Sequence, residues 1–170
     1  MLAFDPRRAI YSFRAATITP AVLFAAPLVS FVVDPGAVWA EYPGIFFHLS
    51  LLLLVPWLDA PVWARTAGYA WVVLDVLTGV LVINDVPHET AWPVRLAGHI
   101  FAGIWIATTS LCVEVLVIRV VGVAAGVWLF GYTFVASVLP EPALGPASVL
   151  TTAWFVLLAV LHKPVRPALS

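Results

Sequence analysis

The chain has 170 residues, of which 63% are hydrophobic and 10% are charged, and its formal net charge is −1. A typical soluble domain is about 45–50% apolar and about 25% charged, so this composition excludes an ordinary water-soluble fold and indicates an integral membrane protein surrounded by a lipid bilayer. Binding to nucleic acid needs clustered Lys and Arg, which the chain lacks. Its single cysteine, Cys112, excludes an internal disulfide and a cysteine-based metal cage.

Six apolar segments follow one another along the chain, and prolines mark most of the breaks between them. A helix needs about 20 mostly apolar residues to cross a bilayer, and barrel strands are shorter and alternate in polarity. We therefore predict an all-α fold, a compact bundle of six transmembrane helices that forms one domain over residues 1–170. The predicted spans are 15–33, 37–58, 66–83, 96–118, 120–139 and 147–162.

The first segment, 15–33, follows three arginines, as the apolar part of a signal peptide would. It is 19 residues long, however, and signal peptides have apolar runs of about 7–15 residues, so we interpret it as a retained span. Pro20 and Pro27 lie seven residues apart, roughly on one face, and each lacks a backbone donor. A kinked or locally opened helix follows, either as a packing kink or as part of a binding site.

The fourth and fifth segments have almost no linker, so we expect a tight hairpin around Arg119. Gly122 and Gly126 give the fifth segment a G-x-x-x-G spacing, which lets helices approach closely. The spacing predicts a helix contact and leaves open whether this contact lies within the chain or between chains.

The chain is also rich in tryptophan, with eight residues. Those near the predicted span ends suit an aromatic belt at the depth of the lipid headgroups. Four lie deeper, and we interpret them as packing residues: Trp71, Trp105, Trp128 and Trp154.

Basic residues fall almost entirely on one side of the predicted six-span topology, and Arg95 alone lies on the other side. Cytoplasmic loops carry an excess of Lys and Arg, so we expect both termini to be cytoplasmic, in a prokaryotic plasma membrane. The residues on the cytoplasmic side are Arg7, Arg8, Arg14, Arg65, Arg119, Lys163 and Arg166, and the acids opposite them are Asp34, Glu41, Asp85, Glu89 and Glu141.

Two acidic residues are candidates for a pathway or a coupling site. Asp75 lies almost at the midpoint of the third segment, with no ionisable residue three or four positions away. Such groups are costly in a bilayer and usually face protein or water. Asp75 is therefore either a protonatable or cation-binding group or a hydrogen-bonded acid that locks two helices. Glu114 lies one turn inside the fourth segment, where an ion pair with Arg65 or Arg119 is the plainer interpretation.

His48 and His99 lie at similar depth on different segments, near the non-cytoplasmic end. We expect no cofactor, but two such histidines are also what haem b needs as axial ligands, and a divalent metal could use His88 as well. The plainer alternative is that each histidine forms local hydrogen bonds. In the binding interpretation, a substrate pocket near this end is lined by Trp39, His48, Asp85 and His99.

No soluble catalytic motif is present, so an enzyme is the less favoured class. The leading hypothesis is a small transporter, or the membrane-embedded substrate-binding subunit of one, for a small-molecule solute or ion. One alternative is an accessory subunit that joins a homo-oligomer or other membrane subunits. The other is a subunit that handles haem or quinone through His48 and His99.

Overall fold

The structure is a computed structural model that describes residues 6–34 and 36–162. It is all-helical, and it confirms six helices that are long and apolar enough to cross a membrane. The helices are α1 (Pro6–Val33), α2 (Glu41–Leu54), α3 (Val62–Ile83), α4 (His88–Cys112), α5 (Leu116–Val135) and α6 (Gly145–Leu161), and short 3-10 helices lie at η1 (Val38–Ala40), η2 (Val55–Trp57) and η3 (Glu141–Leu144).

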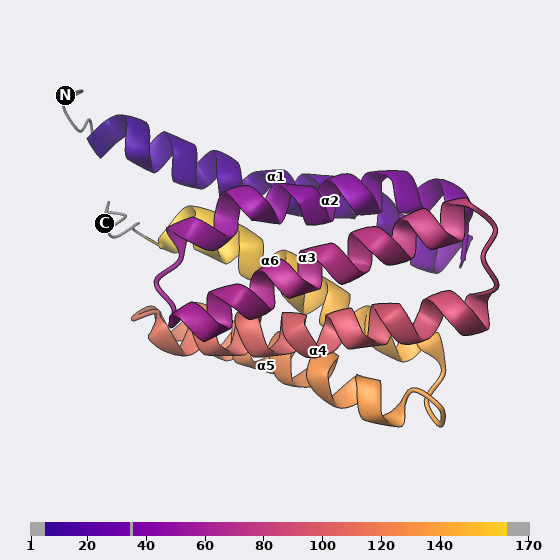
Figure 1. Ribbon diagram of the computed structural model, residues 1–170. Helices are drawn as coiled ribbons and strands as arrows, with labels where there is room; N and C mark the ends of the chain where they lie inside the picture. Colours follow the sequence, from indigo (N-terminus) through magenta and orange to yellow (C-terminus); the bar gives the residue numbers. More distant parts are fainter. Residues whose placement is uncertain (1–5, 35, 163–170) are drawn as a thin grey trace.

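The six helices form a closed ring (Figure 1). Each helix packs against the next one in the sequence, and α6 packs against α1. Short connections make consecutive helices antiparallel neighbours, so the chain runs up and down around the ring. All six helices can therefore contribute side chains to its centre.

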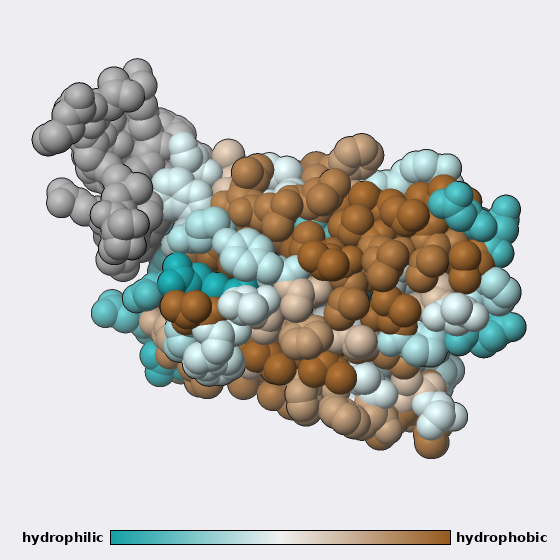
Figure 2. Space-filling view, in the orientation of Figure 1, coloured by the Kyte–Doolittle hydropathy of each residue, from teal (hydrophilic) through white to brown (hydrophobic). Residues whose placement is uncertain are grey.

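Large apolar side chains are exposed on every helix (Figure 2). The hydrophobic surface forms a broad zone over the middle of the molecule, with hydrophilic residues towards both ends. Soluble monomers rarely expose apolar patches larger than a few hundred Å², so this surface suits contact with lipid. One exposed residue from each helix, in chain order, is Val22, Phe46, Val73, Leu111, Val127 and Val160.

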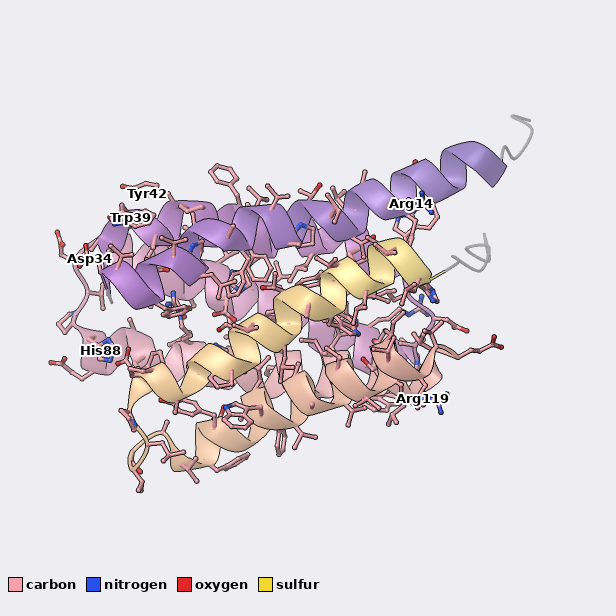
Figure 3. The ribbon with its side chains drawn as sticks, turned by 180° about the vertical axis from the view of Figure 1, so that it is seen from behind. Arg14, Asp34, Trp39, Tyr42, His88 and Arg119 are labelled. Atoms are coloured by element: carbon pink, nitrogen blue, oxygen red, sulfur yellow. The ribbon has the colours of Figure 1, made fainter. Side chains whose placement is uncertain are left out.

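The charged residues divide between the two ends of the bundle. Figure 3 shows Arg14 and Arg119 at one end and Asp34 and His88 at the other. We call the first the arginine end, where Arg14, Arg65 and Arg119 lie together with Asp59 and Glu114. The second is the acidic end, where Asp34, Asp85, Glu89 and Glu141 lie in or beside the loops. Lys163 and Arg166 lie outside the described residues.

The predicted hairpin between the fourth and fifth spans is placed several residues too late. The turn occupies 113–115, between α4 and α5, and Arg119 lies inside α5. The guanidinium of Arg119 instead donates a hydrogen bond from Nη2 to the carbonyl oxygen of Val113, at 2.9 Å. The turn was hard to see because valines surround Glu114 and continue the apolar pattern on both sides.

Glu114 accordingly lies exposed in this turn and not inside a helix. None of the ion pairs among the described residues includes Glu114, so the expected pair with Arg65 or Arg119 is not formed there. This position gives no support to the prediction that Glu114 is a coupling residue.

Of the two forms expected for the first span, a local opening is not seen, because α1 runs as a continuous α-helix through Pro20 and Pro27. A kink at these prolines stays a prediction. Hydroxyl groups still bond to the backbone of this helix. Thr17 donates to the carbonyl of Phe13, and Ser30 donates to the carbonyl of Pro27. Pro27 lies beside the central cavity described below.

Five buried aromatic side chains pack together inside the bundle, and we call them the aromatic plug. They form a cycle of ring contacts, with centroids 5.2–6.0 Å apart at each step. Each is at most 4% exposed. The cycle runs through Trp71, Trp105, Trp154, Phe155 and Phe47. Three of the four deep tryptophans are therefore packing residues as predicted, whereas Trp128 is 45% exposed.

The G-x-x-x-G glycines make contacts within the chain. A Cβ atom added to Gly126 would lie 2.7 Å from the carbonyl oxygen of Gly103 in α4. A Cβ atom added to Gly122 would come even closer to the side chains of Ser110 and Trp154. Both glycines are therefore engaged between α5 and its neighbours in the ring, and this face is not free to dock an accessory partner.

Candidate functional site

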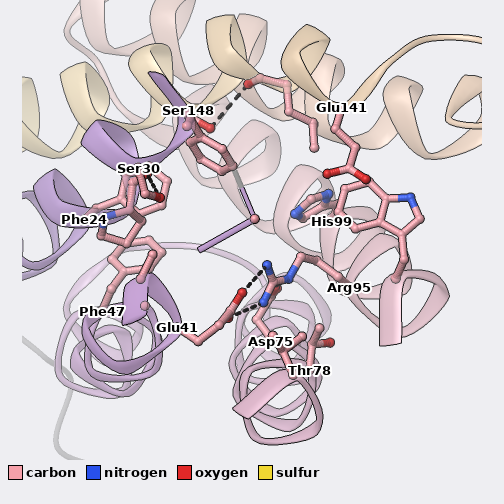
Figure 4. Close-up of a pocket in the computed structure, with 18 of the residues that line it drawn as sticks. Phe24, Ser30, Glu41, Phe47, Asp75, Thr78, Arg95, His99, Glu141 and Ser148 are labelled. Atoms are coloured by element: carbon pink, nitrogen blue, oxygen red, sulfur yellow. Dashed lines mark hydrogen bonds and ion pairs between the residues drawn. The ribbon is translucent and has the colours of Figure 1, made fainter. Parts of the chain in front are cut away.

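A cavity of about 200 Å³ opens at the acidic end of the ring, above the aromatic plug (Figure 4). Its walls include residues from the connecting loops of that end and, deeper down, Phe47 and Trp71 of the plug. Every helix contributes to it. One lining residue from each helix, in chain order, is Phe24, Glu41, Asp75, Arg95, Leu129 and Ser148.

An ion pair between Glu41 and Arg95 crosses one wall of the cavity. The guanidinium donates two hydrogen bonds, Nη1 to Oε1 at 3.0 Å and Nη2 to Oε2 at 2.5 Å. This two-pronged geometry is the strong form of an arginine–carboxylate contact. The side chains of Arg95 and Glu41 are only 22% and 16% exposed, so water screens this pair little.

Asp75 lies next to this pair, and its side chain is 2% exposed. Its Oδ1 is 3.6 Å from Nε of Arg95, and its Oδ2 is 3.7 Å from Nε2 of His48. Both distances exceed the range of about 2.7–3.2 Å for such hydrogen bonds. Oδ2 has no hydrogen-bond partner among the described residues. Both neighbours belong to other helices, Arg95 to α4 and His48 to α2.

The position of Asp75 along its helix differs from the prediction, because α3 begins at Val62 and not at residue 66. Asp75 lies eight residues before the last residue of α3, Ile83, and thirteen after its first. At about 1.5 Å of rise per residue, it is roughly 12 Å along the helix from the acidic end. It is therefore displaced from the midpoint towards the mouth of the cavity.

His48 is held by its own helix in a way that fixes its tautomer. Its Nδ1 lies 2.8 Å from the carbonyl oxygen of Gly44. A carbonyl can only accept, so Nδ1 carries the proton of this bond. In the neutral imidazole the remaining nitrogen, Nε2, is then an acceptor, and it is the atom that faces Asp75.

A glycine in α4 makes room for the carboxylate of Asp75. A Cβ atom added to Gly98 would lie 2.6 Å from Oδ2 of Asp75. Any other residue at this position would press on the carboxylate. The next residue, His99, also lines the cavity, and its Nδ1 is buried without a hydrogen-bond partner among the described residues.

The mouth of the cavity carries a second contact between helices. Nε2 of His88 lies 3.0 Å from Oε1 of Glu141, and both side chains are more than half exposed. The ring of His88 also stacks on Trp92, with centroids 5.4 Å apart. The contact between His88 and Glu141 joins the start of α4 to η3.

The structure brings together part of the predicted pocket. His48 and His99 both line the cavity, as their matching depth predicts. Trp39 and Asp85 do not line it: Trp39 is about half exposed, and Asp85 is an exposed turn residue with φ of 58°. The sequence indicates only how near the end of a helix these two residues lie. It does not give the direction in which their side chains point.

Arg95 is the main residue of this site that the sequence analysis does not predict, because there it only marks the orientation of the helices. It lies four residues before His99, which places both on one face of α4. It is also the one basic residue on the acidic side of the six spans. These two facts single Arg95 out in the sequence, and the structure shows that it turns towards Glu41 and Asp75 inside the bundle.

The haem and metal alternatives gain no support from this geometry. Within residues 6–34 and 36–162, no group of three or more His, Cys, Asp or Glu side chains could hold a metal ion. The cavity is smaller than the roughly 300–1,000 Å³ of sites for drug-sized ligands, and a haem is at least as bulky as those ligands. The roles of His48, His99 and His88 as ligands stay predictions.

No protein-family model, no curated protein and no solved structure matches this chain. Its function is therefore argued from the geometry of the cavity.

Proposed function

We propose that this protein binds a small solute within the membrane, as a small transporter or as the substrate-binding subunit of one. The observation that carries the proposal is Asp75, a buried carboxylate on the wall of a cavity that all six helices line. Buried polar atoms are nearly always hydrogen-bonded, yet its Oδ2 has no partner among the described residues. A bound polar solute would satisfy it.

We propose further that the arginine end faces the cytoplasm and the acidic end faces outward. Basic residues mark the cytoplasmic ends of membrane helices, and Arg14, Arg65 and Arg119 all lie at the arginine end. The solute then enters the cavity from outside, and the aromatic plug closes the path towards the cytoplasm.

The plug has a property that suits a gate. The indole nitrogens of Trp71, Trp105 and Trp154 are buried without hydrogen-bond partners among the described residues. Indole N–H groups usually find a partner when buried, and an unpaired group costs free energy. Opening the plug to water would give these three donors partners, which lowers the free energy needed to open it.

Orientation is tested by labelling single cysteines in intact cells with a reagent that does not cross membranes. The starting variant is Cys112→Ser, since Cys112 is exposed at the arginine end. We expect Glu141→Cys to react in intact cells and Glu114→Cys to react only after the cells are permeabilised. The opposite pattern would reverse the orientation and place the cavity on the cytoplasmic side.

Transport is tested by solute uptake into cells or liposomes that contain the protein, with wild type compared with Asp75→Asn. The substitution keeps the shape of the side chain and removes its charge, so we expect uptake to fall by roughly 10- to 100-fold, the effect of losing a hydrogen bond to a charged group. The matched control is Asp34→Asn, which removes an exposed carboxylate at the same end that does not line the cavity. Equal uptake by wild type and Asp75→Asn would refute the proposal.

A further inference from the structure

Two atoms that are both hydrogen-bond acceptors when Asp75 is ionised and His48 is neutral face each other in the cavity wall. Nε2 of His48 and Oδ2 of Asp75 are 3.7 Å apart, and the bond from Nδ1 of His48 to Gly44 leaves Nε2 of the neutral ring as an acceptor. Two acceptors do not attract each other. A group that carries at least two N–H or O–H donors, placed about 2.8–3.0 Å from each of them, would bond to both.

The charges around this position favour a cation. Arg95 is already paired with Glu41 through two hydrogen bonds, and its Nε is 3.6 Å from Asp75. The opposite charges of Glu41 and Arg95 cancel. An ionised Asp75 therefore leaves these three residues together with one net negative charge. The acids of the acidic end, such as Glu141 at the mouth, add a potential that concentrates cations near the entrance.

The remaining walls suit an apolar body attached to that cation. Phe24, Phe47, Trp71 and Trp92 line the same cavity. Aromatic faces attract cations within about 6 Å, and more strongly where water is excluded. A volume of about 200 Å³ limits the ligand to a few heavy atoms beyond the charged group.

We infer that the cavity binds a small protonated alkylamine, whose ammonium group donates hydrogen bonds to Oδ2 of Asp75 and Nε2 of His48. This inference rests on the proposed function, because it names the chemical class of the solute for the same cavity. The alkyl part lies against the aromatic walls.

Three probes of matched shape test the inference on the purified full-length protein. They are 3-methylbutylammonium, the neutral 3-methyl-1-butanol and the anionic 3-methylbutanoate, titrated by isothermal calorimetry and by tryptophan fluorescence, since Trp71 and Trp92 line the cavity. We expect saturable binding of the ammonium ion that is roughly 10- to 100-fold tighter than binding of the alcohol. We expect no binding of the carboxylate.

The variants locate the binding group. Asp75→Asn and His48→Phe should each weaken binding of 3-methylbutylammonium, with the larger loss in Asp75→Asn, and Asp34→Asn should leave it unchanged. Equal or stronger binding of the alcohol or the carboxylate overturns the inference but leaves a small-solute site. Tight ammonium binding that survives Asp75→Asn also overturns it. If none of the three probes binds saturably, the inference is overturned, and the result counts against the proposed function as well.

Discussion

Replacing Arg95 with glutamine is expected to lower the free energy of unfolding by about 3 kcal/mol. The substitution leaves the carboxylate of Glu41 without its two charged donors in a position that is only 16% exposed. Breaking a fully buried ion pair costs roughly 3–5 kcal/mol, and the partial exposure of this pair places the effect at the lower end. Unfolding by SDS titration in mixed micelles measures it.

Two variants make the Arg95 prediction specific. Arg14→Gln removes an exposed arginine at the other end of the bundle and should change stability by less than about 0.5 kcal/mol. The double variant Glu41→Gln, Arg95→Gln should be more stable than the sum of the single effects, because no unpaired charge remains. If Arg95→Gln and Arg14→Gln had equal effects, the pair would have no structural role.

Replacing Gly126 with alanine is expected to destabilise the bundle by about 1–3 kcal/mol, the usual effect of overpacking. The added Cβ would lie 2.7 Å from the carbonyl oxygen of Gly103 and 2.8 Å from the backbone nitrogen of Ala107. Backbone atoms cannot rotate away as the end of a side chain can, so α4 and α5 must move apart. The same SDS titration measures the loss.

Gly131→Ala is the matched control, because Gly131 lies in the same helix and nothing is within 4 Å of its added Cβ. It should leave stability unchanged or raise it, since alanine favours helices over glycine by up to about 1 kcal/mol. A Gly126→Ala variant as stable as Gly131→Ala would contradict the close contact between α4 and α5.

The sequence predicts the helical fold well because long apolar runs of this length follow a simple rule. Backbone polar groups in a bilayer must form hydrogen bonds within the protein, so long apolar runs are expected to become helices. The structure has six helices of suitable length and composition, one for each predicted span, although several of their ends differ from the prediction. The predicted helix ends are wrong where the apolar pattern of the sequence continues through a turn. The turn at 113–115 consists of Glu114 between two valines, and no proline or glycine marks it.

The candidate site was harder to predict because it depends on the direction of side chains. Depth along a helix correctly brought His48 and His99 to one cavity, and it identified Asp75 as a buried carboxylate. Depth could not show that Trp39 points away from the cavity. It also could not show that Arg95 would turn inward, because a basic residue near a helix end normally lies at the membrane surface.

Access to the cavity tests the central claim most directly. In a Cys112→Ser background, Ser148→Cys would place a thiol on the cavity wall, and Ser110→Cys would place one beyond the plug, nearer the arginine end. A small water-soluble thiol reagent, added to the purified protein in nanodiscs, is predicted to modify Ser148→Cys and to leave Ser110→Cys unmodified. An unreactive Ser148→Cys, or equal reaction of both variants, would contradict a water-filled cavity closed by the aromatic plug.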